Sequence, residues 1–214
     1  MIERVTAEKR PLREERTSAA IQGSAGSASA AGLVYLVMRV WPQHNASALA
    51  SVVVYGVAMV GAFLASALYH GVQDERIKPV LQEIDHCTIF LFIAGTYTPV
   101  AMLPLRQHDG ALLLTAIWVL AIAGIALRLM IRPLYQRIAV PLYLGMGWLC
   151  FGWSGPLYHT VGAVPLLLML AGGLSYTGGL LFYRWHSLPF SNPLWHLCVV
   201  AGSAWFFVAI TRIL

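Results

Sequence analysis

Long apolar runs alternate with short polar connections along almost the whole chain. Each run holds roughly 20 residues, the length that an α-helix needs to cross the hydrocarbon core of a bilayer. Seven runs have this length, at residues 24–41, 48–69, 84–103, 111–131, 138–155, 162–183 and 193–213. The pattern therefore predicts an all-α integral membrane bundle of seven transmembrane helices. We expect residues 1–20 to form a basic cytoplasmic tail and residues 21–214 to form the transmembrane domain.

The first run is the weakest of the seven, because it is rich in Ser, Ala and Gly. Small residues of this kind allow the backbones of neighbouring helices to approach closely in lipid. We therefore keep residues 24–41 as a span and expect it to pack tightly against its neighbours.

The composition supports a membrane protein and excludes a soluble one. Of the 214 residues, 58% are hydrophobic and only 11% are charged, and the mean hydropathy is +0.70. A soluble domain has about 25% charged residues, so this chain has too few charges to cover a globular surface. The net charge of +5 is not a nucleic-acid signature, because most of the basic residues flank the apolar runs. The expected partners are membrane lipids, with no nucleic acid.

The basic residues also predict the orientation of the chain. Eleven of the 14 Lys and Arg residues fall in the tail or in connections on the same side of the membrane as the tail. Since Lys and Arg are enriched in cytoplasmic segments, we expect a cytoplasmic N-terminus. Seven spans then place the C-terminus outside, opposite to the orientation of G-protein-coupled receptors.

Four polar residues fall at a similar depth in the cytoplasmic leaflet. Ser66 and His70 lie near the end of the second run, Asp85 at the start of the third and His196 about one turn into the seventh. Ionisable residues within spans are costly and tend to face the bundle interior or a wet cavity. Two imidazoles and a carboxylate at one depth can hold Zn²⁺ or transfer protons.

Each member of this set also has a structural explanation. A histidine at the end of a span can lie at the interface, Ser66 can be a small packing residue, and Asp85 can cap its helix. Three other histidines, His44, His108 and His159, fall on or near the opposite side and cannot join the set.

A second polar segment, 96–99, interrupts the third run with the sequence TYTP. It begins about 17 Å from Asp85 along a helix, so it belongs to the outer half of the membrane. Pro99 frees a carbonyl group that a Thr hydroxyl can satisfy, which favours a structural kink. The alternative is a segment that gates or lines a lateral cavity.

Five segments in fixed order carry a resemblance to a known family. They are SALYHG, IDHCTIFLFIAGTYTP, YLGMGW, LSYTGGLLFY and LWHLCVVAGS. The sequence resembles the hemolysin III family, the bacterial branch of the progestin and adipoQ receptor (PAQR) superfamily, from about residue 12 to 210. The resemblance implies seven helices with a cytoplasmic N-terminus in a bacterial cell (inner) membrane, an architecture similar to that of alkaline ceramidases. It also implies a zinc ion near the cytoplasmic face.

In the superfamily pattern three histidines hold this zinc. Two of them correspond to His70 and His196, but the third corresponds to Asn192. The serine and aspartate of the pattern correspond to Ser66 and Asp85, which the resemblance implies as catalytic residues that orient a zinc-bound water or hold a neighbouring ligand.

This chain departs from the family pattern at two further positions. Gln22 stands where a histidine of the first helix is common, and Trp205 stands where another is expected. The remaining candidates for a third ligand are Asp85, by direct coordination, Asn192, through its amide oxygen, and His186 in the sixth connection.

The resemblance and the polar set together lead to three functional hypotheses. The first is a zinc-dependent membrane hydrolase that cleaves an amide or ester bond of an amphiphilic, lipid-like substrate. The second is a pore-forming cytolysin, as the family name implies. The third is a non-catalytic regulator of membrane homeostasis, with a proton or ion pathway as one form of it.

Overall fold

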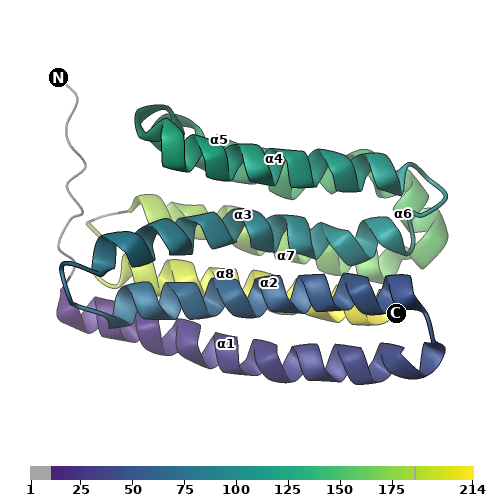
Figure 1. Cartoon of the computed structure of the whole chain (residues 1–214), viewed down its shortest axis with the longest axis horizontal. Coiled ribbons are helices and arrows are strands. Elements are labelled where there is room, and N and C mark those ends of the chain that lie inside the picture. Colours follow the sequence, from purple (N-terminus) through teal and green to yellow (C-terminus); the bar gives the residue numbers. More distant parts are fainter. Residues whose placement is uncertain (1–10, 186) are drawn as a thin grey trace.

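The computed structural model describes residues 11–185 and 187–214, and within them the chain is a bundle of long helices (Figure 1). His186 and the first ten residues lie outside the described residues. In chain order the elements are α1 (Leu12–Val40), η1 (Trp41–Gln43), α2 (Ala46–Gly71), α3 (Lys78–Met102), α4 (Gly110–Met130), α5 (Arg132–Trp148), η2 (Leu149–Trp153), α6 (Ser154–Val161), α7 (Ala163–Arg184) and α8 (Ser191–Ile213).

Five helical segments of the described chain are long and apolar enough to cross a membrane. They are α2, α4, α7, α8 and the run Arg132–Val161 that joins α5, η2 and α6. The prediction of an all-helical, multi-pass membrane protein is thus confirmed. α1 and α3 contain 29 and 25 residues but carry more polar side chains, so their crossing of the membrane stays a prediction. The orientation of the termini likewise stays a prediction.

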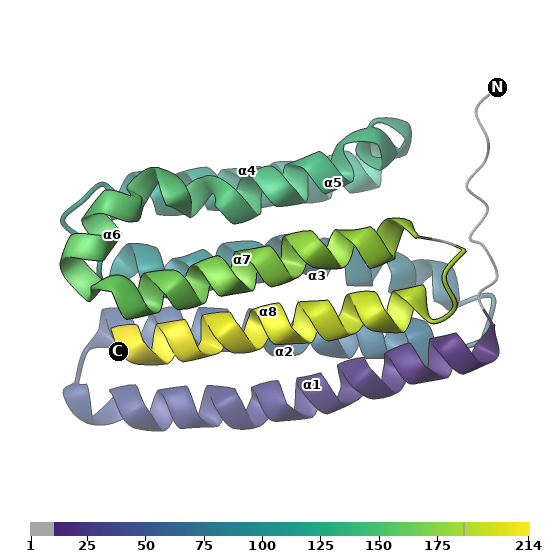
Figure 2. The ribbon, with the colours of Figure 1, turned by 180° about the vertical axis from the view of Figure 1, so that it is seen from behind.

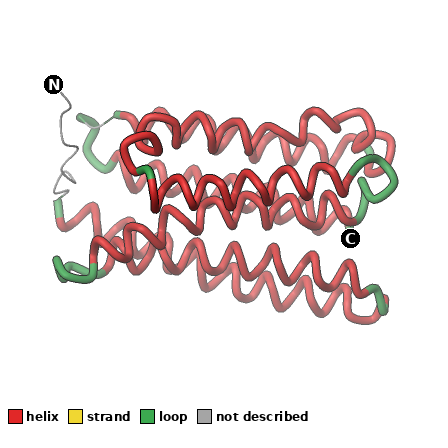
Figure 3. The backbone as a smooth tube through the Cα atoms, turned by 45° about the horizontal axis from the view of Figure 1, so that its top comes forward, coloured by secondary structure: helices red, strands yellow, loops and turns green. Residues whose placement is uncertain are grey.

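The helices lie antiparallel in layers, with α4 and α5 on one side of the bundle and α1 on the other (Figures 1 and 2). α1 packs against α2, α2 against α3, and α7 against α8, and α1 also contacts α8. Loops are confined to the two ends of the bundle (Figure 3). One end of the bundle carries the starts of α1, α3, α5 and α8 and the ends of α2, α4 and α7 (Figure 1). We call this end the histidine end, because it carries His70 and His196.

Small residues bring α1, α2 and α3 close together, as expected for the first span. A Cβ atom added at Gly95 of α3 would lie 2.7 Å from the Cβ of Ala58 on α2. A Cβ atom at Gly56 of α2 would likewise collide with Leu33 on α1. Since real Cβ atoms do not approach this closely, both glycines are required by the packing of these helices.

The first helix begins earlier than the apolar pattern indicates. α1 starts at Leu12, inside the segment 1–20 that the sequence assigned to a tail. Glu14 and Glu15 lie in its first turn, where carboxylates interact favourably with the positive end of the helix dipole. Glu15 and Ser18 are buried, so this part of the segment belongs to the bundle.

The fifth predicted span is broken where the sequence predicted one run. α5 ends at Trp148, and the 3₁₀ turn η2 and the short helix α6 continue the path. Pro141 lies inside α5, and Gly145 and Gly147 lie in its last turn, and both residue types are poor helix formers. The break leaves backbone groups that need partners from elsewhere in the protein.

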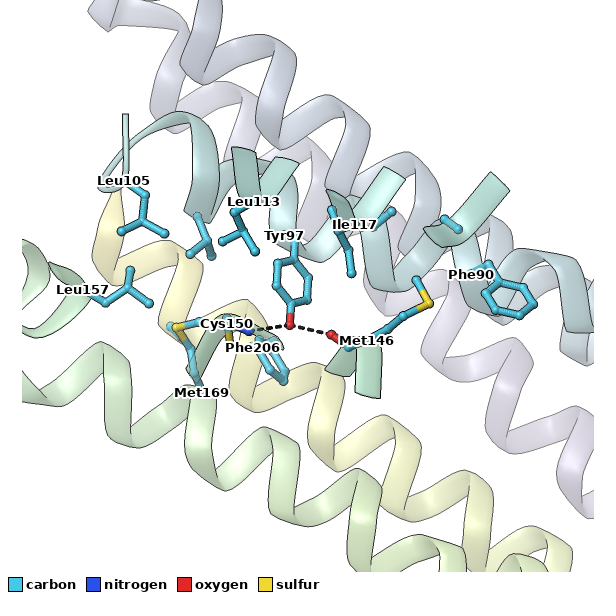
Figure 4. Packing of buried hydrophobic residues seen from close by; sticks show 14 of the residues in the cluster. Phe90, Tyr97, Leu105, Leu113, Ile117, Met146, Cys150, Leu157, Met169 and Phe206 are labelled. Carbon is cyan, nitrogen blue, oxygen red and sulfur yellow. Dashed lines mark hydrogen bonds between the residues drawn. The ribbon is translucent and has the colours of Figure 1, made fainter. Parts of the chain in front are cut away.

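Tyr97 of α3 supplies those partners (Figure 4). Its hydroxyl donates to the carbonyl oxygen of Met146 at 2.6 Å and accepts from the backbone N–H of Cys150 at 2.9 Å. The neighbouring Thr96 and Thr98 hydroxyls donate to carbonyl groups one turn back in α3. These contacts support the structural interpretation of the TYTP segment.

We predict that Tyr97→Phe destabilises the protein by about 1–3 kcal/mol, because it removes the hydroxyl that accepts from the buried Cys150 N–H and that donates to the Met146 carbonyl, which then keeps only the N–H of Leu149. At about 2–4 °C per kcal/mol for a domain of this size, thermal unfolding in detergent micelles should shift by several degrees. Tyr158→Phe is the matched control, since Tyr158 is 53% exposed. Equal melting temperatures for the two variants would contradict the proposed role of Tyr97.

Candidate functional site at the histidine end

A group of buried polar side chains lies between α1, α2 and α8 at the histidine end. Its members come from the first turns of α1, the last two turns of α2 and the first two turns of α8. They are Glu15, Ser18, Gln22, Ser66, His70, Ser191, Asn192 and His196. Helices far apart in the sequence therefore contribute to one site.

Two imidazole rings form the centre of the site. The Nε2 atoms of His70 and His196 lie 3.0 Å apart, and the ring centroids are separated by 4.8 Å in an edge-on arrangement. The two residues are only 4% and 6% exposed. This contact joins α2 to α8 across 126 positions of sequence.

Two neutral amides surround His196. Gln22 Nε2 lies 2.5 Å from His196 Nδ1, and it also donates to the Ser66 hydroxyl at 3.2 Å. Asn192 Nδ2 lies 3.0 Å from His196 Nε2 and donates to the Ser18 hydroxyl at 2.9 Å. Asn192 and His196 share a face of α8 because they are four residues apart.

One atom of the Gln22 amide has no hydrogen-bond partner among the described residues. This atom, Oε1, is buried. If the amide were turned over, the same position would hold an unpartnered N–H₂ group, because the oxygen and nitrogen would simply exchange places. A buried amide atom without a partner is costly, so this position can accept a polar group from outside the chain.

A carboxylate and an ammonium group flank His70 on its other side. Glu15 Oε1 lies 3.3 Å from His70 Nδ1, and Glu15 Oε2 accepts a hydrogen bond from Lys78 Nζ at 2.6 Å. Burial alone would raise the pKa of Glu15, but the hydrogen bonds from His70 and Lys78 outweigh it and lower the pKa. The stabilisation from this carboxylate is therefore present at neutral pH and is lost as the pH falls through the lowered pKa.

Glu15 and Ser18 were missed by the sequence analysis, which placed them in the tail. The signal that could have found them is their spacing with Gln22. Positions 15, 18 and 22 are three and four residues apart, which places them on one face of a helix.

Asp85 lies at the edge of the site. Its carboxylate interacts electrostatically with His70 and with the Ser66 hydroxyl, and it lies 4.0 Å from Nδ1 of its neighbour His86. It is not a helix cap, because α3 begins seven residues earlier, at Lys78. The structure thus brings Ser66, His70 and His196 together and places Asp85 beside them.

The other predicted residues lie where the topology requires. His44, His108 and His159 lie in or beside connections at the opposite end of the bundle. Trp205 lies more than two turns beyond His196 on α8 and is 43% exposed. His186, the remaining candidate ligand, lies outside the described residues.

The donor set does not fit the zinc ion that the resemblance implies. A catalytic zinc is held by three protein ligands, usually His, Cys, Asp or Glu. In residues 11–185 and 187–214, no group of three such residues is placed to hold a metal ion. His70 and His196 supply two imidazoles, and the amide of Asn192 stands beside them as a neutral, weak donor.

An apolar groove begins one turn away from the site and runs along the same three helices. It has a volume of about 310 Å³. Its lining includes Ala25 of α1, Phe63 of α2 and Val200 of α8. Each of these lies three or four residues, about one helical turn, from a residue of the polar site: Gln22, Ser66 and His196 respectively. Ala28 and Ala204 also line the groove and are exposed, so it opens to the surface of the bundle.

Comparison with known proteins identifies relatives along most of the chain. The family model described as "Haemolysin-III related" matches residues 21–207. The chain is 35% identical to Hemolysin-3 of Bacillus cereus over 210 residues, which cover 98% of this chain and 96% of the relative. It is 33% identical to the Hemolysin-3 homolog of Bacillus subtilis (strain 168) over 199 residues, 93% of each chain. It is also 28% identical to the human monocyte to macrophage differentiation factor over 173 residues, 75% of this chain and 69% of the relative.

We predict that Glu15→Gln lowers the stability of the protein at neutral pH by about 1–3 kcal/mol, the usual contribution of hydrogen bonds to a charged group. Glu15→Gln and Lys78→Gln should be non-additive, because the two side chains contact each other. Thermal unfolding of the single and double variants in detergent measures the coupling. Glu14→Gln is the control, since Glu14 accepts a solvent-exposed hydrogen bond from the Phe190 amide. A strictly additive double variant would refute the interaction between Glu15 and Lys78.

Proposed function

The chain belongs to the haemolysin-III related family, and we propose that it is a multi-pass protein of the bacterial cell membrane that binds a lipid-like amphiphile and regulates the membrane without cleaving its ligand. One observation carries this proposal. The buried polar site and the apolar groove are adjacent and are built from the same three helices, α1, α2 and α8. Together they match the two ends of an amphiphile.

The ligand binds with its chain along the groove and its polar end at Gln22. Since lipid tails are as apolar as the groove lining, moving a tail from the bilayer into the groove yields little free energy. The polar end therefore determines affinity. The unpartnered atom of the Gln22 amide, with His196 and Ser66 beside it, favours an uncharged head group that carries a hydroxyl or an amide.

The zinc-dependent hydrolase is the competing function. Its support is the resemblance together with the facing Nε2 atoms of His70 and His196. Because the donor set lacks a third ligand, we derive no step through a metal. Ser66 and Asp85 then act as positioning residues, Ser66 by accepting from Gln22 and Asp85 through its charge.

The pore-forming cytolysin is less well supported by the distribution of polar groups. Among the described residues, the buried histidines and charged side chains lie in turns near the histidine end. Buried polar residues nearer the opposite end, such as Ser51 and Thr98, hydrogen-bond to carbonyl groups of their own helices. Such residues do not form a polar path along the bundle.

We predict that filling the groove abolishes ligand binding. Ala28→Trp places an indole in the groove, so a lipid that co-purifies with the wild type should be lost from this variant in native mass spectrometry. Gln22→Leu should weaken binding about tenfold, since it removes one buried hydrogen bond. Ala123→Trp on the exposed face of α4 is the matched control.

Equal lipid occupancy in Ala28→Trp and Ala123→Trp would refute the groove as the binding site. Lipid that is recovered as a cleaved amide or ester, with cleavage lost in His70→Ala, would establish the hydrolase instead.

We predict that vesicles reconstituted with the wild-type protein retain an encapsulated dye as well as protein-free vesicles do. The measurement is dye release over a range of protein-to-lipid ratios. Leakage that rises with protein and persists in His70→Ala would establish a pore.

A further inference from the structure

The ring nitrogens of both central histidines are engaged by groups of the protein. His70 Nδ1 faces Glu15, and His196 Nδ1 faces Gln22. The two Nε2 atoms face each other, and Asn192 reaches the Nε2 of His196. The histidines are therefore surrounded by close polar contacts from neutral amides, while one atom of the Gln22 amide keeps no partner among the described residues.

We propose that the native site holds no zinc, and that Asn192 is the single residue that prevents these side chains from forming a three-ligand metal site. Asn192 lies one turn before His196 on the same face of α8, beside the gap between the two Nε2 atoms. Its amide bridges His196 and the Ser18 hydroxyl. An uncharged amide neither neutralises a divalent transition metal nor binds it tightly. A carboxylate in its place would do both, and an imidazole would supply a strong nitrogen donor.

Metal binding at this point would involve only donor atoms of α1, α2 and α8, whether or not an amphiphile binds in the groove. One substitution that nearly preserves the shape of the side chain should therefore create metal binding. Asn192→Asp replaces an amide nitrogen by a carboxylate oxygen, and two histidines with one carboxylate form a known zinc ligand set. Asn192→His is the second variant, which restores the three-histidine set but requires more space beside Ser18.

The experiment compares metal binding by full-length proteins purified without a polyhistidine tag. Wild type, Asn192→Asp and Asn192→His are each incubated with zinc in detergent and freed of unbound metal by gel filtration. Zinc is then measured by elemental analysis, and thermal unfolding is followed with and without zinc. Asn45→Asp, which changes an amide to a carboxylate at the cap of α2, is the matched control.

We expect the wild type and Asn45→Asp to retain far less than one zinc ion per chain and to melt at the same temperature with or without zinc. Asn192→Asp should retain about one zinc ion per chain and melt at a higher temperature with zinc, because a ligand of the folded state stabilises it. Adding His70→Ala to Asn192→Asp should abolish both effects.

Two results would overturn the proposal. About one zinc ion per wild-type chain, lost in His70→Ala, would show that the native site is a metal site. Folded Asn192→Asp and Asn192→His proteins that retain no zinc would show that Asn192 is not the missing ligand. If Asn192→His fails to fold, the isosteric variant and the wild type still decide the question.

Discussion

The contact between His70 and His196 is the interaction on which this end of the molecule depends. It links α2 to α8 through two rings that are buried from solvent, so their other nitrogens need partners from the protein. That requirement explains why the start of α1 is helical and buried. Glu15 and Gln22 of α1 each engage one of the two histidines, and α1 is thereby fixed to both α2 and α8.

Much of the fold could be predicted from the sequence, because an apolar run of about 20 residues is typical of a transmembrane helix. The same argument predicts Ser66, His70, Asp85 and His196 at one depth, and the structure has all four near the histidine end. The start of α1 could not be predicted in this way, because Glu15 lies among charged residues that resemble a solvated tail. The break after Trp148 was missed for a related reason: the run stays apolar through η2, and only the tertiary contact with Tyr97 makes a break tolerable.

Family membership does not transfer chemistry to every member. The two bacterial relatives named above match nearly the whole chain at 33% and 35% identity, which establishes a common architecture. The properties of the site depend instead on a few positions, and at two of them this chain has amides. The amides of Gln22 and Asn192 lie against His196, and neutral amides are weak donors for a metal ion. An apolar groove beside such a site suits recognition of a polar end better than it suits hydrolysis.

The hydroxyl of Tyr97 has a consequence for how the chain assembles in the bilayer. Before α5 meets α3, the Cys150 N–H lacks the Tyr97 hydroxyl as its acceptor and the Met146 carbonyl has only the N–H of Leu149, and poorly paired backbone groups in hydrocarbon are disfavoured. The α5–η2–α6 segment is apolar enough to cross a bilayer by itself, but its break gains the two hydrogen bonds of the Tyr97 hydroxyl only when α3 lies beside it. The final shape of this segment is thus coupled to a helix that precedes it in the chain.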